Sequence, residues 1–599
     1  MSTLHIAAGP GRRVIGPDAR ALCCDWEAYD ALRGLCDAGA WEDEIPSDRA
    51  DLVMERCRDW TAGWRFDADG DMTLFAGVSL GESYQWLLWL YFAFPACKFS
   101  VALEEALARR RPSVLRCEDS VPRLFRDVLD EEARKIGLRV ETVAAPARST
   151  LPPPWRMPPM ELAPLMRFAG AAVNAAGAVA ARRGRRDVWT CYYHVLEPVW
   201  RRASESGHPF RWLFANSPSR RLLPTIVRGG GGLLLEHRTP PAFRPAESRA
   251  LEDIRARWRA AREGPGVPPP LRPHLDAWFA DMLPALAWGW LRLQARWERS
   301  RPALLVLPFD GPSLQFFLQT LARRDGVPSV MFLHGLPFHY RLDAEHGKSS
   351  TFLVWGPEQE RIYREGSARL ERGPRIERTG NPHFDLMTAP RRSAPFRRLL
   401  ALSCPVNMLS PLARTIDPER YALETLSAAA DSGEWEISFK IHPSESLERY
   451  RRLLGRRFPK VRILKAESVA QLILESDLVV GPVSTALIEA MLLRRAVFCV
   501  NLTRTPFPPP CDGRWGILLA NDPSSLRERL RSFLKDPGKV QEEALAGQER
   551  ALDAFVGPRD GRSTERFLVR LRAELRPSEA FARIPESPED SSAAEARPS

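Results

Sequence analysis

The polar residues best suited to bind an anion stand directly after an apolar run in the second half of the chain. The run ends at Gly481, and Ser484 and Thr485 then open a helical pattern that carries Glu489 one turn further on. A helix that begins there directs free backbone N–H groups and its positive dipole end into the space beyond the strand. Ser484 and Thr485 add hydroxyl donors, and Glu489 can accept hydrogen bonds from the hydroxyls of a ribose. A phosphate site beside a ribose site indicates a nucleotide.

Two histidines follow apolar strands in the same manner. His334 ends one strand and precedes Gly335, which permits close approach of another backbone. A histidine in that place can act as a general base near neutral pH. Lys440 and His442 alternate onto one side of a second strand, and a cation beside an imidazole suits a diphosphate leaving group. Taken singly, a strand-end histidine is more often structural, and a Ser-Thr helix start is more often only an N-cap.

These residues require strands and helices to position them, and from about residue 72 the sequence alternates between short apolar runs and helical periods. This alternation is typical of a mostly parallel, doubly wound sheet. Two successive series of comparable size predict an α/β fold with two facing Rossmann-like domains and a cleft between them. Ligands of such sheets bind beyond the carboxyl ends of the strands, where the polar residues above are expected.

The predicted domain boundaries follow changes in composition. Residues 1–70 carry tryptophan and charge at helical spacing and are expected to form a helical N-terminal extension. Residues 71–345 are predicted to form the first Rossmann-like domain, with a helical insertion at about 240–300. Residues 346–572 are predicted to form the second, and residues 573–599, rich in Pro, Glu, Ser and Ala, a disordered tail.

Bulk properties narrow the class of protein. A chain of 599 residues is too long to fold around a single hydrophobic core, so several domains are expected. The net charge of +11 comes almost wholly from arginine and suits a nucleotide, an anionic glycan or an acidic membrane surface; a merely solvated basic surface explains it equally well. Ten cysteines form no CxxC pair, and no histidine stands at metal spacing, so no metal site is predicted.

Location is predicted from the absence of a signal-peptide pattern, which favours the cytoplasm and reduced thiols. The longest apolar run, Trp86–Ala96, is too short to span a membrane and is expected to be a buried helix. The small apolar residues 168–181 are flanked by arginines and could lie on an anionic membrane, which would place the protein at its inner face. A packed alanine-rich helix is the favoured explanation of that run because bulky membrane anchors are lacking.

Five motifs together resemble the GT-B glycosyltransferases that build bacterial surface polymers. That group includes capsule Kdo transferases, polysialyltransferases and teichoic-acid glycerophosphotransferases. The motifs are Gly326–Gly335, Phe352–Gly356, Thr379–Asp385, Phe439–Pro443 and Ser476–Ala490. The resemblance covers about residues 300 to 505, and the earlier sequence shares only the alternation of strand and helix.

The resemblance implies that the second domain holds the nucleotide of an activated sugar, with CMP- and CDP-linked donors among those expected, and that the first lies on the side of the acceptor. His442 and the Ser484-Thr485 helix start would bind its phosphates, and Glu489 its ribose. His334 would face the acceptor, a glycan or a glycolipid, as a base or as a further phosphate ligand. A metal ion is unnecessary in principle, since helix-end and side-chain donors can stabilise a departing diphosphate.

Other residues fit this resemblance less firmly. Ser410 and Arg414 follow a strand and could reach the donor, although an ordinary loop explains them equally well. Gly380 and Asn381 would form the turn that joins the two domains. The residues just beyond them that could lie near the cleft are His383 and Asp385.

Two other functions fit the same architecture. A nucleotide-sugar 2-epimerase has a similar Ser-x-x-x-x-Glu helix start and would convert the donor without an acceptor. A catalytically silent protein of glycan binding or assembly would keep the fold without turnover. A shared fold does not decide between these and a transferase.

Overall fold

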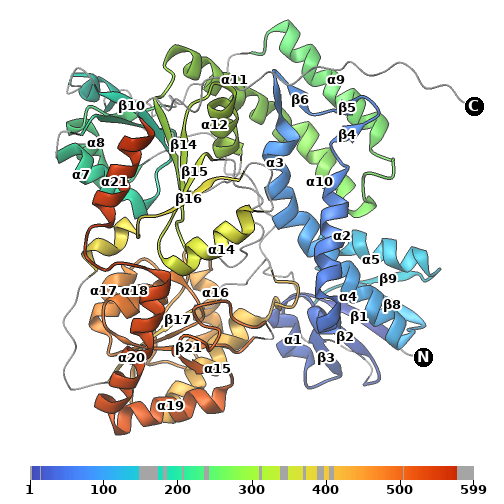
Figure 1. Cartoon of the computed structure of the whole chain (residues 1–599). Helices are drawn as coiled ribbons and strands as arrows, with labels where there is room; N and C mark the ends of the chain where they lie inside the picture. Colours follow the sequence, from blue (N-terminus) through green and yellow to red (C-terminus); the bar gives the residue numbers. More distant parts are fainter. Residues whose placement is uncertain are drawn as a thin grey trace, which may run out of the picture.

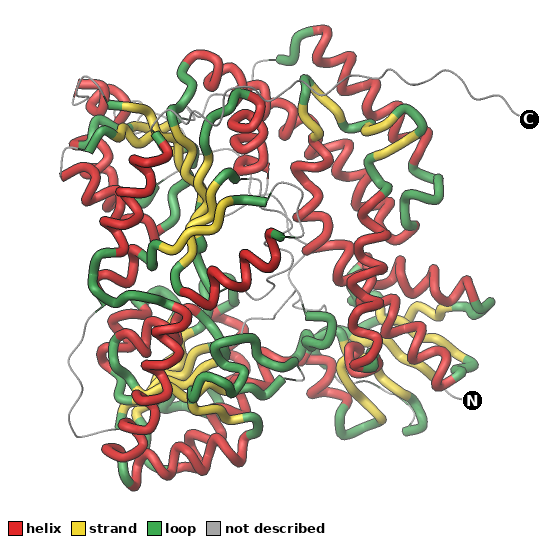
Figure 2. Tube along the Cα trace, viewed as in Figure 1, coloured by secondary structure: helices red, strands yellow, loops and turns green. Residues whose placement is uncertain are grey.

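Three parallel β-sheets organise the chain (Figure 1). The computed structural model describes residues 3–11, 13, 15, 17–146, 173–179, 185–205, 208–216, 218–234, 242–308, 313–336, 349–368, 373–387, 397–403, 410–503 and 505–575. The predicted tail from residue 576 onward and residues 168–172 and 180–181 of the alanine-rich run lie outside these ranges. In Figure 2 the strands of the three sheets form separate groups, with helices between and around them.

The first sheet has five strands in the order β3-β2-β1-β8-β9. Its strands are β1 (Thr3–Ala7), β2 (Arg20–Cys23), β3 (Asp37–Ala40), β8 (Val114–Glu118) and β9 (Val140–Val143). Residues 1–70 are therefore not the purely helical extension that the sequence predicted, because strands β1 to β3 accompany helices α1 (Trp26–Leu32) and α2 (Ala50–Ala62). Strands β8 and β9 come from the part of the chain predicted to begin the first Rossmann-like domain, but they complete this sheet. We call the part of the chain built on this sheet the N-terminal domain.

A long helix leads away from this sheet. It consists of α3 (Leu80–Leu88), the π-helical turn η3 (Trp89–Ala93) and α4 (Phe94–Arg110). By length and composition this is the one helix among the described ranges that could cross a membrane, but 78% of its most apolar window is buried inside the protein. It packs on the helices of the predicted insertion, so the buried helix expected at Trp86–Ala96 is confirmed. Those helices are α9 (Pro245–Ala261), α10 (Arg272–Ala277) and α11 (Leu283–Arg299).

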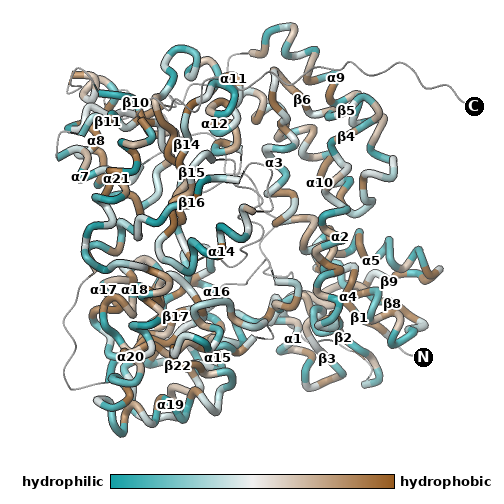
Figure 3. The backbone as a smooth tube through the Cα atoms, in the orientation of Figure 1, coloured by the Kyte–Doolittle hydropathy of each residue, from teal (hydrophilic) through white to brown (hydrophobic). Residues whose placement is uncertain are grey.

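The second sheet has seven parallel strands in the order β12-β11-β10-β13-β14-β15-β16. They are β10 (Arg186–Thr190), β11 (Phe210–Phe214), β12 (Gly232–Leu233), β13 (Leu304–Leu307), β14 (Ser329–Phe332), β15 (Thr351–Val354) and β16 (Arg375–Arg378). Strands β13, β14 and β15 are buried on both faces, which explains their continuous apolar sequence (Figure 3). Strands β15 and β16 continue this sheet beyond residue 345, so the sheets change after Arg378 rather than at the predicted 345/346 boundary.

The third sheet has six parallel strands in the order β19-β18-β17-β20-β21-β22. They are β17 (Arg398–Leu402), β18 (Glu436–Lys440), β19 (Arg462–Leu464), β20 (Leu478–Gly481), β21 (Ala496–Val500) and β22 (Leu518–Ala520). Its helices include α15 (Asp417–Ser432), α16 (Leu447–Leu454), α18 (Thr485–Leu492) and α19 (Pro523–Lys535). The last helix, α21 (Ser563–Glu574), returns to the second sheet and packs on α7 (Glu197–Glu205).

The second and third sheets confirm the predicted pair of Rossmann-like domains. In each sheet the second and third strands along the chain lie on one side of the first strand, and the fourth lies on its other side. This is the doubly wound order. One hydrophobic cluster joins them, since it includes Val330 of β14 as well as Val479 of β20. A ligand of such sheets binds where the strand order reverses, at the carboxyl ends of β10 and β13 and of β17 and β20.

Candidate functional site

The two Rossmann-like domains approach each other where β14 ends and α18 begins. The backbone N–H of Leu336 lies 3.3 Å from the Thr485 hydroxyl oxygen and donates to it. A Cβ placed on Gly335 would lie 3.4 Å from the same oxygen, which is an ordinary van der Waals contact, so the approach does not require glycine. The structure therefore brings together His334, Gly335, Ser484 and Thr485, which the sequence placed in two separate motifs.

Glu489 lies one turn into α18 and is 7% exposed. Its Oε2 has no hydrogen-bond partner among the described residues, and the same holds for Ser484 Oγ and for the side-chain nitrogen of Asn381. Burial raises the pKa of Glu489 to about 7. A buried polar atom left unpaired costs about 1–3 kcal/mol, so the two at the start of α18 point to a ligand that would pair them.

Two more histidines line this position. His383 Nε2 lies 3.8 Å from Glu489 Oε1, and the ring of His194 stands perpendicular to that of His383 with centroids 5.6 Å apart. Burial, and next the nearby His194, lower the pKa of His383 to about 4. Because Glu489 ionises only near pH 7 and His383 gains a proton only near pH 4, the two side chains are not oppositely charged at any pH. We treat the contact as one between a neutral imidazole and a carboxyl group.

His334 is oriented by the backbone. Its Nδ1 lies 3.1 Å from the carbonyl oxygen of Pro308, which can only accept, so Nδ1 carries the proton and Nε2 the lone pair. The ring of Tyr193 meets it edge-on, with centroids 5.2 Å apart. Burial lowers the pKa of His334, and the neighbouring His194 acts in the same direction. A neutral imidazole with this tautomer can accept a proton at neutral pH.

His442 has the opposite tautomer. Its Nδ1 accepts from the backbone N–H of Ser444 at 3.2 Å and lies 2.6 Å from the Ser444 hydroxyl oxygen. Its own backbone N–H donates to Glu445 Oε2 and to Ser403 Oγ, each at 2.9 Å. The proton therefore sits on Nε2, which can donate to an anion. His442 follows β18, whose carboxyl end lies on the same edge of the third sheet as the start of α18.

Lys440 uses most of its donors within the protein. Its ammonium donates to the carbonyl oxygens of Ile441 at 3.0 Å and Lys465 at 2.9 Å, and the residue is 8% exposed. One of its three N–H bonds is left for a ligand. Gly481 likewise has a packing role, since a Cβ there would lie 3.0 Å from the Cβ of Leu402.

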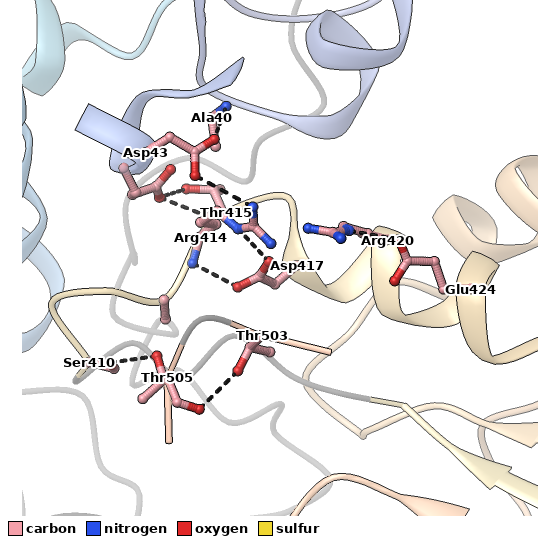
Figure 4. Close-up of polar contacts among 12 residues, drawn as sticks. Ala40, Asp43, Ser410, Arg414, Thr415, Asp417, Arg420, Glu424, Thr503 and Thr505 are labelled. Carbon is pink, nitrogen blue, oxygen red and sulfur yellow. Dashed lines mark hydrogen bonds and ion pairs between the residues drawn. The ribbon is translucent and has the colours of Figure 1, made fainter. Parts of the chain in front are cut away.

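Residues 413–415, just before α15, are attached to the N-terminal domain (Figure 4). Ser410 Oγ lies 3.0 Å from Thr505 Oγ1, so it stays on the side of the third sheet. Arg414 does not reach toward a donor as expected. Its Nε donates to Asp417 Oδ1 at 2.8 Å and its Nη1 to Asp43 Oδ1 at 3.4 Å, which holds the guanidinium between two carboxylates.

Neighbouring contacts strengthen this attachment, which we call the interdomain clamp (Glu42, Asp43, Lys98, Arg414 and Thr415). The backbone N–H of Thr415 donates to Glu42 Oε1 at 2.8 Å, and its hydroxyl donates to the same oxygen. The Lys98 ammonium donates to the carbonyl oxygen of Ala413. Burial raises the pKa of Glu42, although Lys98 opposes the rise.

The predicted turn at Gly380 and Asn381 packs against the start of α21. Gly380 has a φ of +78°, and a Cβ there would collide with Ser563. Asn381 accepts from the backbone N–H of His383 at 3.0 Å. Asp385 accepts from the backbone N–H groups of residues 563 and 564, at 2.9 and 2.7 Å, and so caps α21.

The sequence reasoning did not select Tyr193 and His194, although they contact His334 and His383. The rule that selected His334, a histidine just beyond an apolar strand, would also have found His194 after β10. No group of three or more His, Cys, Asp or Glu side chains that could hold a metal ion occurs within the described ranges. Metal-independent chemistry remains a prediction.

In the N-terminal domain the corresponding reversal point is filled by the chain itself. Arg13 Nη2 donates to Glu118 Oε2 at 2.9 Å and to the carbonyl oxygens of Ala8 at 2.9 Å and Gly9 at 2.7 Å. The backbone N–H of Ala8 also donates to Glu118. These groups satisfy one another, whereas those around Glu489 do not, so we place the ligand site between the second and third sheets.

Neither a family model nor a curated protein sequence matches the chain. Solved structures similar to it include the UDP-GlcNAc 2-epimerase from Neisseria meningitidis bound to UDP-GlcNAc, with 12% identity, coverage of 65% of this chain and 100% of that one, and a TM-score of 0.40. An Anabaena protein in complex with UDP and glucose is 10% identical, with coverage of 65% of this chain and 99% of that one and a TM-score of 0.40. A wall teichoic acid polymerase is 10% identical, with coverage of 69% of this chain and 98% of that one and a TM-score of 0.38. At these values the function has to be argued from the site.

Proposed function

We propose that this protein is a GT-B glycosyltransferase that moves a sugar from a nucleotide donor to a surface-polysaccharide or lipid-linked glycan acceptor. The observation that carries the proposal is the two unpaired buried atoms on Ser484 and Glu489 at one helix start, next to the strand end that holds His334. A nucleotide offers hydroxyls to the carboxyl oxygen and phosphate oxygens to the hydroxyl and amide donors. The motifs that resemble such enzymes fall at the same positions.

The reaction requires a base on one side and stabilisation of negative charge on the other. In our proposal the Nε2 lone pair of His334 accepts the proton of the acceptor hydroxyl as the sugar is transferred. The N-terminus of α18 and the Nε2–H of His442 then hold the charge that develops on the departing nucleotide. Fixed donors of this kind make a metal ion unnecessary in the proposed mechanism.

The donor and the location belong to the same proposal. A CMP- or CDP-linked sugar is our first choice of donor, and we place the enzyme in the cytoplasm at the inner face of the membrane. A shift in melting temperature on addition of CMP, CDP, UDP or GDP would identify the donor class, because a ligand that binds only the folded state stabilises it by mass action.

The transferase is tested by turnover with and without an acceptor. We expect a purified sample to consume the donor only when an acceptor glycan is present. His442→Ala should abolish transfer and leave the melting temperature nearly unchanged, while the exposed control Gln471→Ala on α17 (Val469–Glu475) should keep full activity. Full activity of His442→Ala would remove His442 from the mechanism.

A second candidate, nucleotide-sugar 2-epimerisation, is favoured by one feature. Exposed His194, half-buried His383 and buried Glu489 form a contiguous group able to exchange protons, and none of them is needed to activate an acceptor. Conversion of a nucleotide sugar without acceptor would favour the epimerase. Binding without turnover, across varied acceptors, would instead favour a silent binding or assembly protein.

A further inference from the structure

A second hollow lies away from the candidate site, between the N-terminal domain and the third sheet's helices. It has a volume of about 230 Å³. Side chains of α1, α15 and α19 line it, together with the turn after α16. The residues that matter for its chemistry are Trp26, Arg33, Arg420, Glu424, Arg457 and Arg527. Figure 4 shows two of them, Arg420 and Glu424, on α15 beyond the interdomain clamp.

The lining of this hollow is more basic than acidic, since it includes four arginines and one glutamate. Three arginines have acidic neighbours: Arg33 with Asp30 at 2.9 Å, Arg420 with Glu424 at 2.7 Å and Arg527 with Asp431 at 3.3 Å. The pairs of Arg33 and Arg527 are largely exposed and that of Arg420 is half-buried, and pairs in contact with solvent contribute little to stability. Arg420 and Arg527 can therefore turn toward a stronger anion at little cost.

Two features indicate unused binding capacity. Arg457 makes no ion pair with any residue that the structure describes. The Nε–H of Arg527 is buried and finds no acceptor there. Arg33 is held in place, since its guanidinium lies over the ring of Trp26 at 5.9 Å from the centroid. Trp26 itself is 6% exposed and packs into the core cluster of the third sheet, which gives the hollow a rigid floor.

We propose that this hollow binds a phosphate or diphosphate group. Guanidinium forks match phosphate oxygens in geometry, and several forks on separate helices suit an anion with more than one charge. The volume falls below the roughly 300–1,000 Å³ of sites that enclose whole organic ligands. It therefore suits a free diphosphate, or the diphosphate end of a nucleotide whose remainder projects into solvent.

A bound diphosphate would contact both domains at once. Arg33 belongs to the N-terminal domain, whereas Arg420, Arg457 and Arg527 belong to the third sheet's domain. The anion would thus tighten a junction that already includes the interdomain clamp. This inference does not depend on the proposed glycosyl transfer.

The test is calorimetric titration of the full chain with inorganic diphosphate. We expect binding by the unaltered protein and at least a tenfold loss of affinity in the Arg457→Gln/Arg527→Gln double variant. The matched control Arg452→Gln/Arg456→Gln removes two exposed charges on and just after α16 and should bind as the unaltered protein does. In His442→Ala, which alters the nucleotide site, the binding that is lost in Arg457→Gln/Arg527→Gln should persist.

Several results would overturn the inference. They are the absence of binding, equal affinity in both double variants, or loss of binding in His442→Ala alone, which would put the anion in the nucleotide site. If the first double variant does not fold, the single variant Arg457→Gln, at an exposed position, should still weaken diphosphate binding about threefold. Unchanged affinity in that variant would refute the inference. A parallel titration with UDP separates the sources, because reduced UDP affinity in Arg457→Gln/Arg527→Gln assigns a nucleotide and unchanged UDP affinity assigns the free anion.

Discussion

The free energy of unfolding should depend on pH through Glu489, and Glu489→Gln should remove that dependence. Burial raises the pKa of this carboxyl from its ordinary 4.5 to about 7 in the folded protein. Below about pH 4.5 the group is protonated in both the folded and unfolded states, so it adds no penalty. Above pH 7 it is ionised in both, and the buried charge destabilises the folded state. The gap between the two pKa values corresponds to about 3 kcal/mol, lost progressively between pH 4.5 and pH 7.

Glutamine keeps the shape of the side chain and has no proton to lose. We therefore expect Glu489→Gln to match the unaltered protein at pH 4.5 and to exceed it in stability by up to about 3 kcal/mol at pH 8. Nucleotide affinity should fall in the same variant, because an amide replaces a carboxyl oxygen that accepts from ribose. A change that raises stability and lowers binding is the signature of a residue kept for function.

The assay is urea unfolding at the two pH values, followed by tryptophan fluorescence, with nucleotide titration on the same samples. Glu436→Gln is the matched control, because the Glu436 side chain is 72% exposed on β18 and its change should stay within about 0.5 kcal/mol at both pH values. A Glu489→Gln protein that is less stable than the unaltered one at pH 8 would refute the reasoning. That result would mean that the carboxylate is paired in the folded state and serves the structure.

Three further changes test separate contacts. Thr415→Val removes the hydroxyl that donates to buried Glu42 and should lower the free energy of unfolding by about 1–3 kcal/mol in urea titrations, whereas Ser427→Ala on exposed α15 surface should not. Gly380→Ala places a Cβ at positive φ against Ser563 and should lower the melting temperature by several degrees in calorimetry. His334→Gln should lower the transfer rate about 10²–10⁴-fold in steady-state kinetics, with donor affinity unchanged, and a wholly unaffected rate would exclude His334 as the base.

The part of the site that sequence could predict rests on a local rule. Apolar strands that end in His334, His442 or Gly481 each place a polar group at a carboxyl end, and parallel pairing brings those ends to one edge of a sheet. No long-range information is needed for that inference. The same rule applies to His194, so its omission was an incomplete use of the rule and not a limit of the sequence.

The parts of the fold and of the site that the sequence did not predict depend on contacts between residues far apart in the chain. Strand β1 pairs with β8, so that Thr3 lies opposite Val114, and no local pattern specifies that partner. Strands of four or five residues between strongly helical segments also carry a weak signal of their own. Arg414 illustrates the same limit in the site, because Asp43, which holds its guanidinium, lies 371 positions earlier.

The N-terminal domain acts as a bridge between the two Rossmann-like domains. Its helix α4 shares a hydrophobic cluster with Leu305 of β13, while Trp26 of α1 lies in the cluster of the third sheet. The interdomain clamp adds buried polar contacts to the second of these attachments. Two domains joined only at a cleft would be expected to move freely against each other. A third domain attached to both limits that motion, so the positions of His334 and Glu489 relative to one another are set by the whole chain rather than by the ligand alone.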